Sequence, residues 1–278
     1  IIPSILFVIF SRFSIRQETR YMLLGNALLC DLIYLLFYAL SATLSAARVS
    51  LPKEACVLQL FLLAVAYCGG LFTAAAIVLD TCIAVLFPLR YIAILPASRT
   101  KKVIVLLWIC SGALPGIFFL VLSSTHNFVP CVLETCSIPI IIILTLSGTV
   151  AVKLCFWLSA MIIFLFLSLI FCCYAILYFK TRQSGIWESV CSRASVTFLM
   201  HNTVLFFYFS PLLVLFVESF LYVNVIGLQT GIWVSLTICN VLMMLPKVLF
   251  PFLYGLRYRE ISASLKSIVR RKRLHLVS

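Results

Sequence analysis

Two charged residues, Asp31 and Lys247, lie deep inside long apolar stretches of the sequence. A charge in the middle of an apolar medium costs from about 2.5 to more than about 10 kcal/mol, so each should face the interior of the fold and find a partner. An acid and a base can neutralise each other, which predicts a buried ion pair between distant parts of the chain. The alternative is that Lys247 extends toward the membrane surface or is partly hydrated.

The other residues that could do chemistry form no catalytic or metal-binding pattern. No metal cluster follows from the three histidines, His126, His201 and His275. His201 is either a pH-sensitive polar contact or, more simply, a hydrogen-bonded core residue. There is no glycine-rich phosphate loop, ordered Ser-His-Asp set or evident pair of catalytic carboxylates. We therefore expect no enzyme activity, no metal and no cofactor.

The composition indicates the solvent that surrounds these residues. The chain is 64% hydrophobic and only 10% charged, whereas a soluble domain is about 45–50% apolar and about 25% charged. A bilayer crossing takes about 20 apolar residues in a helix, because a backbone group left unpaired in lipid costs several kcal/mol. The sequence therefore predicts an all-α integral membrane protein. Most of its 12 cysteines lie in apolar runs and should behave as small hydrophobic residues.

Apolar runs predict the membrane helices that position the two charges. We place seven of them at 1–10, 21–44, 55–85, 103–121, 150–178, 196–216 and 227–254. The first run is about half as long as a crossing, so we expect it to be the inner half of a truncated first helix. The apolar run 138–146 is also too short, and we expect an outer loop or an extension of the fifth helix. An eighth crossing is the less favoured alternative.

The basic residues orient the predicted bundle. Nearly all of the 21 Lys and Arg residues fall in the loops of one side; the exceptions are Arg48, Lys53 and Lys153 on the other side and Lys247 within the last span. Since Lys and Arg are retained in the cytoplasm, we expect an extracellular amino end and a cytoplasmic carboxyl end. The net charge of +13 then suits anionic inner-leaflet lipid and not nucleic acid.

The tail after residue 254 has apolar residues at every third or fourth position, namely Tyr258, Ile261, Leu265 and Ile268. This spacing predicts an amphipathic helix along the inner membrane surface, with basic residues toward the lipid headgroups. A solvated basic tail is the alternative. The chain thus divides into a membrane domain at 1–254 and a cytoplasmic amphipathic helix with a basic tail at 255–278.

Three ordered motifs lie near the predicted cytoplasmic ends of the third, sixth and seventh helices. They are Asp80 followed by Pro88-Leu89-Arg90-Tyr91, Arg193-Ala194 with Thr197 and His201, and Pro251-Phe252-Leu253-Tyr254. The set resembles the rhodopsin-like (class A) G-protein-coupled receptors, and the odorant receptors among them. Asp31, Trp108 and Pro211 fall where that family has its most typical residues, so the resemblance covers nearly the whole chain.

The resemblance implies roles for these residues. It implies a cytoplasmic coupling region formed by Asp80, Thr81, Cys82, Pro88, Arg90, Arg193 and His201. It implies switch and hinge positions at Phe209, Pro211, Pro251 and Tyr254. Proline removes a backbone hydrogen bond and kinks a helix, and in the family the inner half of the sixth helix swings outward on activation. A static kink filled by aromatic residues is the alternative.

The sequence departs from the family pattern at three positions. Thr81 stands where the family has an arginine, Cys82 where it has a tyrosine, and Phe250 where it has an asparagine. In the family that arginine contacts the G protein in the opened cavity. An unusual mode of coupling, weak coupling and no coupling therefore all stay open.

The resemblance also implies a polar cavity and a disulfide. In the family the positions of Asp31 and Lys247 line one cavity, where the aspartate joins a sodium site. We hypothesise that the Lys247 ammonium takes the place of sodium there. Cys56 is expected to form an outer disulfide, with Cys136 as first choice of partner and Cys131 and Cys155 as alternatives.

These expectations favour a G-protein-coupled receptor, orphan or odorant-receptor-like, that transmits an extracellular ligand signal across the plasma membrane. Its expected partners are an unknown small-molecule or peptide ligand, a heterotrimeric G protein and the bilayer. Family position implies a ligand pocket lined by Leu63, Val65, Phe156, Ser159, Leu212 and Ile232. A non-signalling receptor-like protein, acting as a decoy or heteromer partner, is the alternative. A transporter is less favoured because it predicts repeats and several ionisable groups.

Overall fold

The described part of the chain is helical. The computed structural model describes residues 2–11, 17–47, 49, 52–87, 89–124, 150–183, 200, 203–211, 213–214 and 229–257. The helices are α1 (Ile2–Ser11), α3 (Thr19–Ala46), α4 (Lys53–Leu86), α5 (Tyr91–Ile94), α6 (Ala97–Ser124), α8 (Val150–Gln183) and α10 (Gln229–Arg257). A further helical segment, 203–211, matches part of the predicted sixth span.

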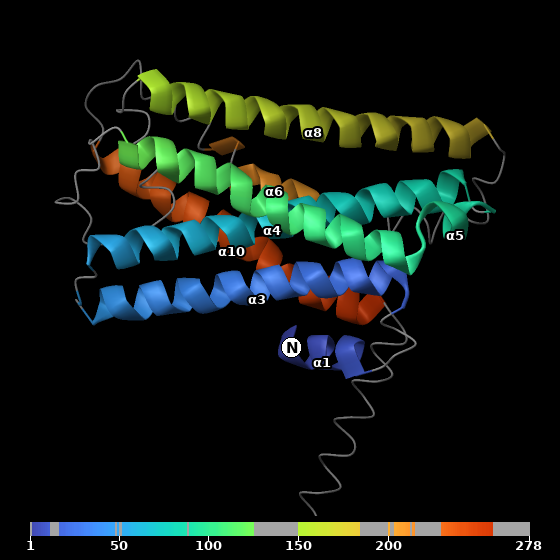
Figure 1. Ribbon diagram of the computed structural model, residues 1–278, viewed down its shortest axis with the longest axis horizontal. Coiled ribbons are helices and arrows are strands. Elements are labelled where there is room, and N and C mark those ends of the chain that lie inside the picture. The colour runs from blue at the N-terminus through green and yellow to red at the C-terminus, as the bar shows by residue number, and fades with distance from the viewer. Residues whose placement is uncertain are drawn as a thin grey trace, which may run out of the picture.

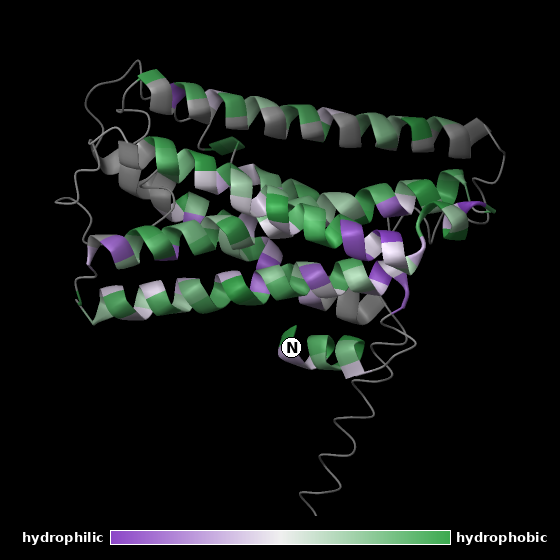
Figure 2. Ribbon diagram, in the orientation of Figure 1, coloured by the Kyte–Doolittle hydropathy of each residue, from purple (hydrophilic) through white to green (hydrophobic). Residues whose placement is uncertain are grey.

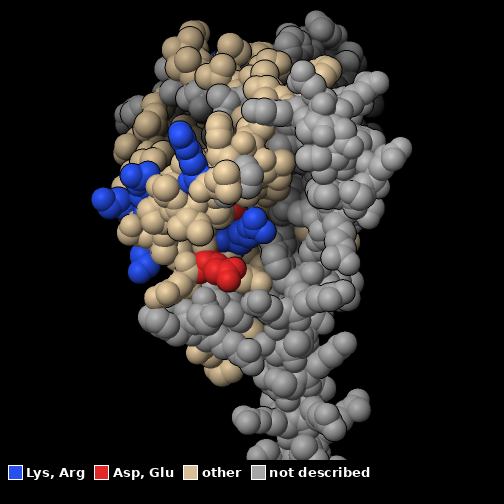
Figure 3. All heavy atoms as spheres, turned by 90° about the vertical axis from the view of Figure 1, so that its right-hand side faces the viewer, with Lys and Arg blue, Asp and Glu red and all other residues tan. Residues whose placement is uncertain are grey.

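The long helices lie side by side and form one elongated bundle, in which α3, α4, α6 and α8 alternate in direction (Figure 1). Helix α3 packs against α4, which also packs against α6 and α8, while α10 packs against α3 and α1. Helices α3 and α6 begin, and α4 and α8 end, at the end that carries α5 (Figure 1). Figure 3 shows this end of the bundle, where Lys and Arg side chains gather.

Three described helices are long and apolar enough to cross a membrane: Thr19–Ala46, Glu54–Leu86 and Ala97–Val121. Figure 2 shows that hydrophobic residues extend along most of their length. Large apolar side chains on α6, such as Ile109 and Leu120, point away from the bundle and are exposed. An outward apolar face of this kind is suited to lipid.

The observed helices extend beyond several of the predicted spans. Helix α6 begins at Ala97 and not at 103, so it includes Arg99, Lys101 and Lys102. The apolar run marks only the part of a helix inside hydrocarbon, whereas the helix itself continues into the aqueous layer where basic side chains are solvated. The short helix α5 was not predicted.

A buried polar network joins α3, α4 and α6. The Asn26 side chain donates to Thr73 Oγ1 at 2.8 Å and accepts from Trp108 Nε1 at 2.9 Å. Thr73 in turn donates to the backbone carbonyl of Gly69 at 2.6 Å. Lipid tails are as apolar as the surfaces of the helices, so the hydrophobic effect does little to hold the helices together. Hydrogen bonds between side chains of different helices therefore help to orient them.

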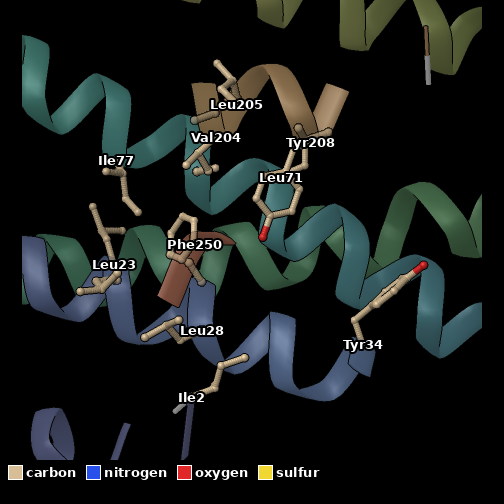
Figure 4. Packing of buried hydrophobic residues seen from close by; sticks show 14 of the residues in the cluster. Ile2, Leu23, Leu28, Tyr34, Leu71, Ile77, Val204, Leu205, Tyr208 and Phe250 are labelled. Atoms are coloured by element: carbon tan, nitrogen blue, oxygen red, sulfur yellow. The ribbon is translucent and has the colours of Figure 1, made fainter. Parts of the chain in front are cut away.

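The apolar core is formed by α1, α3, α4, α10 and the segment 203–211. Figure 4 shows Phe250 of α10 among Leu23 and Leu28 of α3 and Val204 of the segment. Phe250 is fully buried. Phe250, where the resemblance led us to expect an asparagine, contributes an apolar ring to the core.

Candidate functional site

The two membrane charges meet in the interior of the bundle. Lys247 Nζ on α10 lies 3.4 Å from Asp31 Oδ1 on α3, although the residues are 216 positions apart in the sequence. Both side chains have 0% of their surface exposed. A buried charge left without its partner is strongly destabilising, so this pair fixes α10 against α3.

Three tyrosine rings surround the Lys247 ammonium. The distance from Nζ to the ring centroid is 4.3 Å for Tyr34, 5.0 Å for Tyr67 and 4.7 Å for Tyr208. Each ring comes from a different element, namely α3, α4 and the segment 203–211. The negative face of an aromatic ring attracts a cation, and the attraction increases when water is excluded. We call Asp31, Lys247 and these three tyrosines the charge cage.

Tyr208 links the charge cage to the segment that contains Pro211. Its hydroxyl donates to Asp31 Oδ1 at 2.5 Å, and its backbone carbonyl accepts a hydrogen bond from the Tyr67 hydroxyl. Its ring also packs edge-on against Phe250, with centroids 6.5 Å apart. The charge cage therefore holds together α3, α4, α10 and the segment 203–211.

Gly70 on α4 leaves the space that Tyr208 occupies. A Cβ at this position would lie 3.1 Å from Tyr208 Cε1, 3.2 Å from its hydroxyl and 3.5 Å from Asp31 Oδ1. The two distances to Tyr208 are shorter than nearly all real Cβ contacts, and this ring is held by its hydrogen bond to Asp31. A side chain at position 70 would therefore push Tyr208 away from Asp31.

We expect Gly70→Ala to lower the melting temperature of the purified protein. Overpacking costs about 1–3 kcal/mol, which exceeds the gain of about 0.5–1 kcal/mol from replacing a helical glycine. The matched control is Gly112→Ala on α6, because nothing lies within 4 Å of a Cβ there. This variant should melt at the same or a higher temperature. Equal shifts in the two variants would contradict the close approach at Gly70.

A second polar cluster lies at the end of the bundle that carries α5. The Tyr91 hydroxyl donates to Asp80 Oδ1 at 2.7 Å. The Arg20 guanidinium lies over the Tyr91 ring, 5.9 Å from its centroid. Burial and the hydrogen bond to Asp80 raise the pKa of the Tyr91 phenol to about 12, so it stays protonated and able to donate at neutral pH. The cation that interacts electrostatically with Asp80 is thus Arg20 of α3 and not the next residue of α4.

Thr81, in the position of the family's arginine, forms a bond within its own helix. Its hydroxyl donates to the Ile77 carbonyl at 2.8 Å, and the neighbouring Cys82 is buried. No long cationic side chain therefore follows Asp80 on α4. A partner that needs a cation at this position would not find one there.

No protein-family model matches this chain. The human (Homo sapiens) protein named Probable G-protein coupled receptor 148 is 29% identical over 271 residues, which are 93% of this chain and 75% of that protein. The chain is similar to a G-protein-coupled receptor. The predictions of receptor resemblance and of an all-α membrane bundle are confirmed.

The receptor-like chain contains a disulfide at Cys56, at the start of α4. The side chain of its partner lies outside the described residues, so Cys136 stays a prediction. No disulfide is formed by Cys30, Cys68, Cys82, Cys110, Cys172, Cys173 or Cys239. They lie within helices, as expected for cysteines that act as small hydrophobic residues.

The remaining predicted site residues are only partly described. Phe209 is half-buried, Pro211 and Pro251 are buried, and Arg90 is exposed beside α5. Of the predicted ligand pocket, Leu63 is buried and Val65 half-buried in α4. The residues or side chains outside the described part are Pro88, Phe156, Ser159, Arg193, His201, Leu212, Ile232 and Tyr254. The amphipathic tail also lies outside it beyond Arg257.

Sequence reasoning missed the tyrosines of the charge cage, Gly70 and Arg20. Tyr34 carried a usable signal, since it follows Asp31 by one helical turn and so lies on the same face of α3. Arg20 was counted only as one of the basic residues of the inner side. Its proximity to Asp80 depends on how α3 packs against α4, which no local pattern encodes.

Proposed function

We propose that this protein is a plasma-membrane receptor that passes an extracellular ligand signal to a heterotrimeric G protein. In this proposal the amino end is extracellular and the end that carries α5 is cytoplasmic. The observation that carries the proposal is the similarity to a G-protein-coupled receptor along 93% of the chain. The gathering of Lys and Arg at the end that carries α5 supports the orientation (Figure 3).

The charge cage joins the segment 203–211 to α3 and α4. In this proposal the segment packs against these helices in one of two arrangements. Tyr208 lies just before the buried Pro211 and bonds to both α3 and α4. A ligand shifts such an equilibrium only through its differential affinity for the two arrangements. We propose that ligand binding moves the segment 203–211 relative to the buried ion pair, with Pro211 as the hinge.

The end that carries α5 has features suited to a protein partner. Leu89 is fully exposed and Ile92 is 81% exposed, next to the exposed Arg90. Large apolar side chains in an aqueous layer beside basic ones are typical of surfaces that bind another protein. We propose that this loop contacts the G protein.

A second candidate function is that of a non-signalling receptor-like protein. The observation that favours it is Thr81, whose hydroxyl is engaged within α4 and which offers no cation. In this case the chain would bind ligand, or pair with another receptor, without activating a G protein.

The two candidates differ in the effect of Thr81→Arg. We expect the full-length parent protein to raise basal second-messenger levels, such as cAMP, in transfected cells. Thr81→Arg should raise this signal about tenfold, because one charge-assisted hydrogen bond contributes about 1.5–3 kcal/mol. The matched control is Thr81→Met, a long side chain without charge, measured at equal surface expression.

The outcome assigns the function. Signalling by the parent supports the receptor proposal, whereas signalling by Thr81→Arg alone supports the non-signalling candidate. If neither the parent protein nor Thr81→Arg signals in reporters for any of the G-protein classes, coupling through this end of the bundle is contradicted.

A further inference from the structure

We infer that Lys247 is a resident cation of the charge cage and that the buried Asp31 carboxylate, as a consequence, does not bind sodium. The inference concerns the interior of the bundle and does not depend on whether the chain couples to a G protein. It is carried by the position, burial and partners of the Lys247 ammonium.

The resemblance to class A receptors implies a sodium ion beside the helix-two aspartate. The residues present do not fit that ion, because the Lys247 ammonium lies 3.4 Å from the same carboxylate. A sodium ion bound to this carboxylate would be a close neighbour of the ammonium, and two unit cations near one another repel strongly in a medium of low dielectric constant. The aspartate already has a cation that is covalently attached to α10.

The charge balance leads to the same conclusion. Asp31 and Lys247 form a neutral pair, and both are fully buried. Adding a sodium ion would leave a net positive charge inside the membrane, which is costly. The three rings at 4.3–5.0 Å already present their negative faces to the ammonium. Their attraction for a cation is therefore used by Lys247.

The hydrogen-bonding capacity left at Asp31 suits a neutral donor. Oδ1 accepts bonds from Lys247 and Tyr208, while Oδ2 is buried and has no partner among the described residues. One water molecule can satisfy a single acceptor of this kind. A sodium ion needs several oxygen ligands, and the facing position on α4 is Gly70, which has no side chain.

A cation attached to the chain and a cation from solution differ in how the stability of the protein depends on salt. Stabilisation by a bound ion follows mass action and increases with the ion's concentration. Stabilisation by Lys247 is independent of the salt composition of the medium. The packing of α3, α4, α10 and the segment 203–211 should then be insensitive to the choice of monovalent cation.

The test is thermal unfolding of the full-length protein in detergent micelles, in NaCl, KCl and choline chloride at equal ionic strength. We expect the wild-type melting temperature to be the same in all three salts. A higher melting temperature in NaCl than in KCl would overturn the inference. This comparison uses only the wild-type protein and does not depend on a variant that folds.

A variant makes the test sharper. Lys247→Ser removes the ammonium and leaves space and a hydroxyl beside the Asp31 carboxylate. We expect NaCl to raise its melting temperature above the value in KCl by about 2–4 °C, the shift that roughly a fivefold excess of sodium over its dissociation constant would give. The matched control, Asp31→Asn with Lys247→Ser, has no carboxylate and should show no sodium effect. An equal sodium effect in both variants would overturn the inference.

Discussion

Replacing Lys247 with methionine is expected to lower the melting temperature of the protein by about 10 °C. Methionine fills a similar volume but leaves the buried Asp31 carboxylate without its cation. Removal of one partner of a buried pair costs about 3–5 kcal/mol, and each kcal/mol corresponds to roughly 2–4 °C in a chain of this size. Thermal unfolding in detergent, followed by circular dichroism or a thiol-reactive dye, measures the shift.

The double variant Asp31→Asn with Lys247→Met is the decisive companion. It removes both charges and keeps both side-chain volumes, so it should recover most of the stability that Lys247→Met loses. Residues in direct contact are expected to give non-additive effects of this kind. If the losses of the two single substitutions simply added in the double variant, Asp31 and Lys247 would not be coupled.

The second large effect is expected for Tyr208→Phe. The substitution keeps the ring over the Lys247 ammonium and removes only the hydroxyl that donates to Asp31. A hydrogen bond to a charged group contributes about 1.5–3 kcal/mol, so the melting temperature should fall by about 4–8 °C. Differential scanning fluorimetry of the purified variant measures the loss.

Tyr34→Phe is the matched control for this substitution. Its ring also faces the Lys247 ammonium, but its hydroxyl donates to Met243 Sδ at 3.5 Å and not to a charge. Sulfur is a weak acceptor, so the loss should be small. If the melting temperature fell equally in Tyr208→Phe and Tyr34→Phe, the hydrogen bond to Asp31 would contribute no more stability than the one to Met243.

Much of the fold could be predicted because lipid imposes a simple rule on the chain. A long apolar run has to be a helix, so the positions of α3, α4, α6, α8 and α10 followed from hydropathy alone. The ends of the helices could not be predicted from hydropathy, because a helix continues past the hydrocarbon layer. The basic residues at the start of α6 show this, since Arg99, Lys101 and Lys102 are helical although they interrupt the apolar pattern.

The site was predictable only in its charged part. A charge inside an apolar run is conspicuous, so Asp31 and Lys247 could be identified from the sequence and paired by their need for a partner. The tyrosines were not conspicuous, because the chain has 11 of them and many lie in apolar runs. Their role depends on which rings meet around one nitrogen atom, and that is fixed by the packing of four elements.

Arg20 and Gly70 are hard to identify from the sequence for the same reason, since their roles also depend on how the elements pack. Arg20 resembles any other basic residue at a predicted cytoplasmic edge. Gly70 is one of 10 glycines, and only the approach of Tyr208 distinguishes it from Gly112. Local patterns describe what a residue is suited to do, whereas these two residues act through neighbours that are remote in the chain.

The distance in sequence between the two charges has a consequence for biosynthesis. Asp31 leaves the ribosome long before Lys247, which follows 216 positions later on the last described helix. Throughout that interval the nascent chain holds an acid in or near the membrane without its own base. A product that stops before α10 never acquires that base, so quality-control machinery that recognises exposed intramembrane charge can distinguish it from the finished protein.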